Sequence, residues 1–271
     1  MSVINTNVNA LFAQNALRVN NRKLSGAMEQ LSSGTRIASA KDDAAGIAIS
    51  STMTAQIRGL GQAVRNANDG VSLLQTAEGA MTEQTNMLQR MRELAIQSST
   101  GTYNTAQQGY LDKEYQALAT QIEAITTQTK WNGANVLDAT GGDGSGKYTF
   151  AVGSTGTETI EVSIASMSNL IAGDVTDSTK ATAAITAIDT ALGKVNASRA
   201  VLGAGMNRLT YAADNLNNVI QNVTASRSQI QDTDYATATT QLARAQIIQQ
   251  AATAMLAQAN QSPQSVLALL K

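Results

Sequence analysis

The sequence predicts a mainly α-helical protein, a long helical coiled-coil rod with one small β-hairpin region. Apolar residues recur at alternating intervals of three and four over long stretches on both sides of the middle of the chain, the pattern of helices packed along their length. The chain contains one proline, so little interrupts a helix. Only 3% of its residues are aromatic, whereas compact cores depend heavily on large aromatic side chains. Narrow aliphatic seams between long helices therefore fit the composition best.

The longest repeats lie in residues 44–130 and 181–230. In the second range the apolar positions keep one register, with interruptions at Arg199 and Arg227. They include the following residues: Ile188, Val195, Leu202, Leu209 and Leu216. A helix of about 50 residues would be roughly 75 Å long, so we expect a rod-like body.

The two ends of the chain carry narrower stripes, rich in alanine and interrupted by Asn and Gln. The leucines of these stripes are Leu17, Leu24 and Leu31 near the start, and Leu242, Leu256 and Leu270 near the end. The stripes fit two interpretations, solvent-exposed amphipathic helices or helices that find their partners in other copies of the chain. We favour the second, because a segment that buries too little apolar surface alone becomes ordered on binding.

The middle of the chain, residues 131–180, changes character. It is rich in Gly, Thr and Ser, and it contains two runs of alternating apolar residues separated by Gly153–Gly156, which predict a β-hairpin. The chain therefore runs outward and returns, so both termini are expected at the same end. The predicted divisions are 1–43, 44–130, 131–180, 181–230 and 231–271.

The composition argues against an enzyme. The chain has no cysteine and no histidine, so thiolate chemistry and the commonest general base and metal ligand are absent. The net charge of −1 leaves no basic cluster for nucleic acid. No signal peptide is visible and no stretch reaches the roughly 18 apolar residues of a membrane span. These features predict a soluble, cytosolic chain with no cofactor and no membrane insertion.

Two motifs partly match known binding sites, but each lacks residues that the site requires. Gly141–Lys147 satisfies the first seven positions of a phosphate-binding loop, but Tyr148 follows where Ser or Thr is required, so we expect a turn before the hairpin. Asp232 and Asp234 lack the glycine and glutamate of a calcium loop. One of them is expected to cap the last helix.

By the same capping argument, Asp42 or Asp43 is expected to cap a helix that begins near Ala44.

Several short motifs, in order along the chain, resemble those of bacterial flagellins. They are Ile4–Asn7, Leu31–Ile37, Ser39–Gly46, Arg65–Gly70, Gln89–Ala95, Asp234–Ala236, Arg244–Ile247, Leu256–Gln261 and Leu269–Lys271. The resemblance covers roughly residues 1–137 and 181–271. Where many flagellins carry large variable outer domains, this chain has only the short middle insert, which implies a thin, smooth filament subunit.

The resemblance implies a structural subunit that assembles with itself into the extracellular flagellar filament, the propeller for motility. The terminal helices would pair as an inner core, ordered only on assembly. Export through the flagellar secretion apparatus would replace the cytosolic expectation, since that route needs no signal peptide. The implied partners are a flagellar export chaperone and the hook-associated and cap proteins.

The resemblance also implies a surface patch that a vertebrate Toll-like receptor recognises on many relatives. The matching positions are Gln89, Arg90, Leu94 and Glu114, which could equally serve subunit packing. Two alternatives to a filament subunit remain open at this point. They are a hook–filament junction protein and a surface binding protein of the same family.

Overall fold

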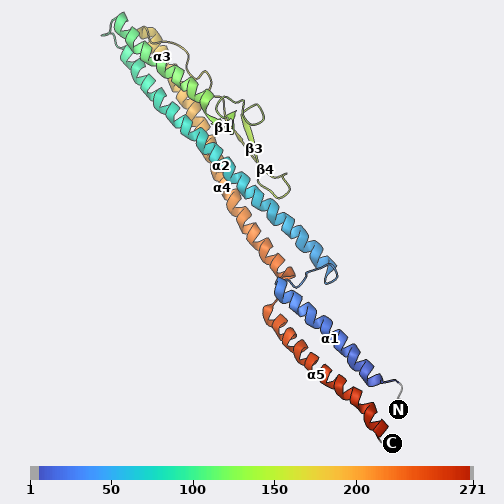
Figure 1. Cartoon of the computed structure of the whole chain (residues 1–271). Coiled ribbons are helices and arrows are strands. Elements are labelled where there is room, and N and C mark those ends of the chain that lie inside the picture. Colours follow the sequence, from blue (N-terminus) through green and yellow to red (C-terminus); the bar gives the residue numbers. More distant parts are fainter. Residues whose placement is uncertain (1–5, 269–271) are drawn as a thin grey trace. The chain divides into compact units, whose positions relative to one another are not determined.

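The computed structural model describes the backbone of residues 6–268 and the side chains of residues 6–261, and its elements are mainly long helices (Figure 1). The helices are α1 (Val8–Ser33), α2 (Ala44–Ser99), α3 (Thr105–Gln128), α4 (Ser178–Gln231) and α5 (Tyr235–Ala268). The strands are β1 (Lys130–Trp131), β2 (Ala134–Asn135), β3 (Lys147–Ala151) and β4 (Thr159–Ser163). The predicted fold class is confirmed, α2 begins at Ala44 as expected, and α4 spans nearly the range 181–230 of the predicted repeat.

The described chain forms two compact units. The terminal unit combines the residues up to Ala55 with those from Asn222 onward, and the central unit is Gln56–Gln221. Both limits lie inside a helix, α2 or α4, because the first turns of α2 and the last turns of α4 belong with the connectors to α1 and α5. The five functional divisions that the sequence suggested remain a prediction.

The core of the central unit is a long seam between α2, α3 and α4. The fully or almost fully buried residues of α4 follow one another at steps of three and four, as the repeat predicted. They are Ala181, Ala184, Ile188, Ala191, Val195, Ser198, Leu202, Gly205, Leu209, Ala213 and Leu216. An ion pair between Arg92 on α2 and Asp189 on α4, 2.8 Å long, lies at the edge of this seam.

The predicted hairpin is present as the antiparallel pair β3–β4. Tyr148 lies opposite Val162 in its register. Ile160 and Val162 are buried in the central core. Asn66 of α2 donates a hydrogen bond to the carbonyl of Ala151, 3.2 Å away. Packing against α2 therefore holds the hairpin in place.

The glycine-rich segment Gly141–Lys147, which partly matches a phosphate-binding loop in sequence, forms a turn, as expected. Asp143 Oδ1 accepts hydrogen bonds from the amide and hydroxyl of Ser145, and the next residues enter β3 and not a helix. The hydroxyl and amide of Ser145 lower the pKa of Asp143.

Both expected helix caps are present. Asp43 Oδ1 accepts from the amide of Gly46, 2.9 Å away, at the start of α2. Asp234 Oδ1 accepts from the amide of Ala236, 2.9 Å away, at the start of α5. Hydrogen bonds from the Thr237 hydroxyl and from the amides of Ala236 and Thr237 lower the pKa of Asp234. A carboxylate at these positions satisfies amides that the helix itself leaves without partners.

Tyr115 of α3 makes the central unit sensitive to alkaline pH. Its side chain is fully buried and its hydroxyl has no hydrogen-bond partner among the described residues. Burial raises its pKa to about 12. The stabilisation from keeping this phenol neutral is complete below pH ~10, the unfolded pKa, and is lost as the pH rises toward 12. The loss amounts to about 2 to 3 kcal/mol.

We therefore expect Tyr115→Phe to flatten the alkaline part of the stability profile. Urea unfolding, followed by the fluorescence of the sole tryptophan, Trp131 in β1, would be measured at pH 8 and pH 11 for both proteins. The wild type should lose more stability between these pH values than the variant. Equal losses would show that Tyr115 is not the titrating group.

Candidate functional site: the terminal helix pair

Helices α1 and α5 lie side by side and antiparallel in the terminal unit (Figure 1). Asn7 at the start of α1 donates to the carbonyl of Ala259, 2.8 Å away, near the end of α5. Further along, Asn20 donates to the carbonyl of Ala245, also at 2.8 Å. The outer ends of the two helices are therefore together, as the out-and-back course of the chain predicted.

The seam between α1 and α5 is built from small residues. Its buried residues are Ala10, Asn20, Ala27, Ala238 and Ala245. The predicted stripe leucines, Leu17, Leu24, Leu31, Leu242 and Leu256, flank it and are half-buried. Leu270 lies outside the described residues. An alanine seam buries little apolar area per residue, so the pair gains little stability from its own contacts.

The stripe leucines therefore lie along the seam of the pair within one chain, where they are half-buried. Met28, which lies between the stripe residues Leu24 and Leu31 in the sequence, is 54% exposed and does not lie in the seam. Asn20 and Ala27 occupy the seam instead. The spacing in the sequence indicates that Asn20 and Ala27 belong to the seam, because residues 17, 20, 24, 27 and 31 follow one another at steps of three and four.

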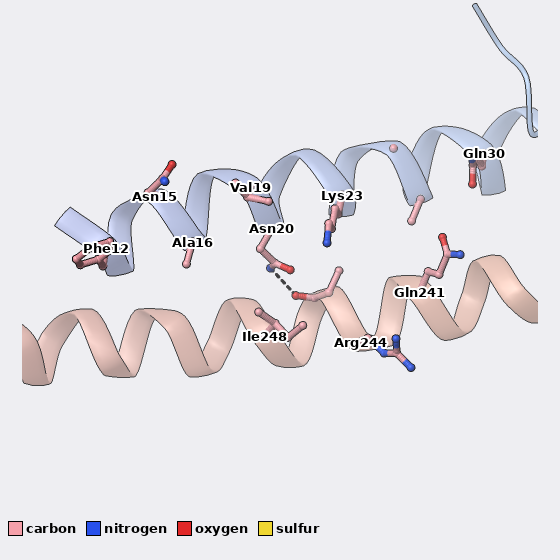
Figure 2. A pocket seen from close by; sticks show the side chains of 13 residues that line it. Phe12, Asn15, Ala16, Val19, Asn20, Lys23, Gln30, Gln241, Arg244 and Ile248 are labelled. Carbon is pink, nitrogen blue, oxygen red and sulfur yellow. Dashed lines mark hydrogen bonds between the residues drawn. The ribbon is translucent and has the colours of Figure 1, made fainter. Parts of the chain in front are cut away.

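A groove runs over one face of the pair (Figure 2). It has a volume of about 830 Å³, and its lining includes Phe12, Val19 and Ile248 together with the cations Lys23 and Arg244. A second hollow of about 700 Å³ shares Phe12 and Ile248 with it and extends the lining to other residues, including Met255. Phe12 and Met255 are 70% and 65% exposed. None of these groove residues was predicted from the sequence as a site residue.

The large apolar side chains that are exposed on the described chain gather on these two helices. Nine of fourteen lie on α1 or α5. They are Val8, Leu11, Phe12, Val19, Met28, Tyr235, Ile247, Ile248 and Met255. A concentration of exposed apolar side chains is unusual on a monomeric protein and is typical of interaction surfaces.

The connectors at the inner end of the pair are bonded to each other. Thr35 and Asp232 form an antiparallel bridge. The amide of Thr233 donates to the carbonyl of Gly34 at 3.0 Å, and the amide of Arg36 donates to the carbonyl of Gln231 at 2.7 Å. We call residues 34–36 with 231–233 the connector clasp.

Comparison with known proteins identifies the family. The family model described as the bacterial flagellin N-terminal helical region matches residues 4–141, and the one for the C-terminal helical region matches residues 185–270. A flagellin of Halalkalibacterium halodurans is 46% identical over 275 residues, covering 99% of this chain and 100% of the relative. The chain belongs to the bacterial flagellins.

Two further comparisons agree. Flagellin A of Vibrio anguillarum is 34% identical over 379 residues, covering 99% of each chain. The crystal structure of Bacillus cereus flagellin has a TM-score of 0.52 and 33% identity, covering 56% of this chain and 88% of that one. Because the Vibrio alignment is more than a hundred positions longer than this 271-residue flagellin, this chain is a short member of the family.

As a flagellin, the chain is a structural subunit of the extracellular flagellar filament. Flagellins are structural proteins. Across the described residues, no helix has both the length and the apolar character needed to cross a membrane.

The positions matched to a receptor patch of flagellins lie on α2 and α3 of the central unit. Arg90 forms ion pairs with Glu93 at 3.0 Å and with Glu114 at 2.9 Å, and hydrogen bonds to both raise its pKa. Gln89 is exposed beside it. Leu94 is only 1% exposed, so it packs in the core beneath the patch and is not available for receptor contact.

Proposed function

We propose that the terminal helix pair is the element through which copies of this flagellin pack into the filament. The observation that supports this proposal is the gathering of exposed apolar side chains on α1 and α5. The stripe leucines Leu17, Leu24, Leu31, Leu242 and Leu256 act indirectly, because they hold the two helices together.

The energetics of burial support this assignment. Complete burial of a large apolar side chain stabilises an assembly by roughly 1.5 to 3 kcal/mol. Phe12, Ile248 and Met255 line the grooves of one pair, so neighbours that cover them contribute several such increments. A contact between unlike surfaces of successive copies does not close on itself and extends into an open filament.

The same surface accounts for the expected ordering of the terminal helices on assembly. The seam is mainly alanine around a buried asparagine, so the two helices gain little stability from packing against each other. Contacts with neighbouring copies supply the missing packing, so the pair becomes fully ordered on assembly.

Replacing the exposed apolar surface should impair assembly without disturbing the central unit. We expect Phe12→Ser combined with Met255→Ser to raise the concentration needed for seeded polymerisation at least tenfold, since about 1.4 kcal/mol corresponds to a factor of ten. Electron microscopy and sedimentation would measure it. Gln14→Ser is the matched control, because Gln14 is an exposed polar residue on the same helix. Normal assembly of the double variant would refute the proposal.

Other flagellar proteins are assigned to the same surface. An export chaperone would cover the apolar groove of the unassembled subunit, and hook-associated and cap proteins would contact it at the two ends of the filament. The subunit has no catalytic role in this proposal.

We propose in addition that a Toll-like receptor contacts the patch of Gln89, Arg90 and Glu114. The support is the exposed ion-pair arrangement, in which Arg90 is held by two carboxylates. Exposed ion pairs contribute little to stability, so Arg90→Ala should leave the fold intact.

A receptor reporter assay on heat-dissociated monomer tests this assignment. Arg90→Ala is expected to lower the response at least tenfold. Arg92→Ala is the control, because Arg92 pairs with Asp189 of α4 and not with Glu114. A response equal to wild type from Arg90→Ala would remove Arg90 from the patch.

A further inference from the structure

The seam of the terminal pair carries little information about its own register. On α5 the residues Ala238, Ala245, Ala252 and Ala259 repeat every seven positions, and on α1 Leu17, Leu24 and Leu31 do the same. A slip of one heptad would again bring alanine and leucine together at these positions, and only Gln249, between Leu242 and Leu256, interrupts the neighbouring row of α5. Sequences whose side-chain pattern repeats in this way specify register weakly unless a distinctive group intervenes.

The buried Asn20 does not supply this distinction. Its amide donates to the backbone carbonyl of Ala245, and every residue of α5 has such a carbonyl. One heptad away on either side, Ala238 and Ala252 offer the same small side chain. The hydrogen bond of Asn20 therefore stabilises the pairing of α1 with α5, but it does not favour one heptad register over the next.

The connector clasp is distinctive and firmly attached. Besides its own backbone bonds, the guanidinium of Arg36 donates to the carbonyl of Ile230 at the end of α4. The next residue, Ile37, is only 2% exposed. It packs so closely on the start of α2 that a Cβ at Gly46 would lie 2.5 Å from its Cδ1.

The connectors leave no slack for a slip. Helix α1 ends at Ser33, directly before Gly34 of the clasp, and α5 begins at Tyr235, two residues after Thr233. A heptad slip moves one helix by about 10 Å along the other. One or two residues span at most about 3.5 Å each, so the pair cannot slip while the clasp is closed.

We infer that the connector clasp sets the register of α1 against α5, and through it the shape of the groove that the pair presents. The statement about register stands on the contacts within one chain. Only the consequence for neighbouring copies depends on the proposed assembly role of the pair.

Thiol cross-linking can test the register because the chain has no cysteine of its own. Gln249 donates to Asn21 across the pair at 3.3 Å, so Asn21→Cys with Gln249→Cys reports the observed register. Gln14→Cys or Met28→Cys with Gln249→Cys reports a slip of seven residues either way. All three partners are exposed positions of α1. The bifunctional thiol reagent must be shorter than the slip.

With the clasp intact, the full-length protein, diluted into filaments of cysteine-free subunits, should cross-link at least tenfold more in the observed register than in either slipped one. Insertion of Gly-Ser-Gly between Thr233 and Asp234 should raise the slipped yields at least fivefold. The same insertion after Gly156, in the turn of the hairpin, should change nothing. Slipped yields that stay low after the connector insertion would overturn the inference.

A second variant guards against misfolding of the insertion. Arg36→Ala removes the bond to α4 without lengthening the chain, and it should raise the slipped yields in the same direction. Unchanged yields from this variant would also count against the clasp. Filament formation is scored separately on cysteine-free protein, so a failure of the assembly proposal is distinguishable from a failure of the register inference.

Discussion

Filaments are expected to be absent when Leu24 is replaced by aspartate or proline. Leu24 is half-buried in the seam between α1 and α5, and a carboxylate there would have to lose water without gaining a partner, at a cost of several kcal/mol. Proline inside α1 would remove a helical hydrogen bond and clash with the preceding turn, at about 3 kcal/mol or more. A loss of about 3 kcal/mol per subunit raises the concentration needed for assembly roughly a hundredfold.

Seeded polymerisation with electron microscopy would measure this effect, and circular dichroism would confirm that the central unit keeps its helices. Ser25→Asp is the matched control, because Ser25 is the exposed neighbour of Leu24 on the same helix. Leu256→Asp should reproduce the defect from the α5 side of the seam. Normal filaments from Leu24→Asp would show that the seam is not needed for assembly.

The periodicity of the sequence predicted the helices because their buried faces repeat strictly. In α4 the apolar positions themselves mark the face, so both the extent of the helix and its register could be read directly. The hairpin could be predicted from the sequence equally well, since its alternating apolar residues pair across the strands as expected. These elements complete their packing within the central unit, and the local pattern therefore reflects their burial.

The terminal pair was predicted less well for two physical reasons. Asn20 is polar and yet lies in the seam, because its amide reaches a carbonyl of the facing helix. Phe12 and Met255 are apolar and yet exposed. A side chain whose partner is another molecule follows no burial rule of its own chain, so its role needs the three-dimensional surface.

The residues of the patch on the central unit differ in their exposure. Gln89, Arg90 and Leu94 are near neighbours in sequence, and the resemblance grouped them with Glu114. Helical geometry separates them, since Leu94 points into the core whereas the others face outward.

Thr126→Val is expected to destabilise the central unit by about 1 to 3 kcal/mol, the usual cost of a buried polar group left without a partner. Gln84 of α2 is fully buried, and its amide donates to the hydroxyl of Thr126 on α3 at 2.9 Å. Valine has nearly the shape of threonine but accepts no hydrogen bond. The Gln84 amide would keep only the distant carbonyl of Ile122, at 3.5 Å.

Gln84→Leu should behave differently, although it breaks the same bond. The Oε1 atom of Gln84 already lacks a partner among the described residues, and the Thr126 hydroxyl would keep its own bond to the carbonyl of Ile122, 3.0 Å away. Leucine therefore removes an unsatisfied atom and fills similar space, so the change should be neutral or stabilising.

The double variant Gln84→Leu/Thr126→Val leaves neither amide nor hydroxyl buried and should be more stable than Thr126→Val alone. Urea unfolding followed at Trp131 would give the four free energies of this cycle. A loss from Gln84→Leu as large as that from Thr126→Val would mean that the pair stabilises the fold through its bond. The expected difference between the two single variants would mean that the bond mainly avoids the cost of burying the Gln84 amide without a partner. Gln84 would then serve to fix the alignment of α2 with α3. Its neighbours in the core are aliphatic, so its amide has a hydrogen-bond partner only when Thr126 lies opposite it.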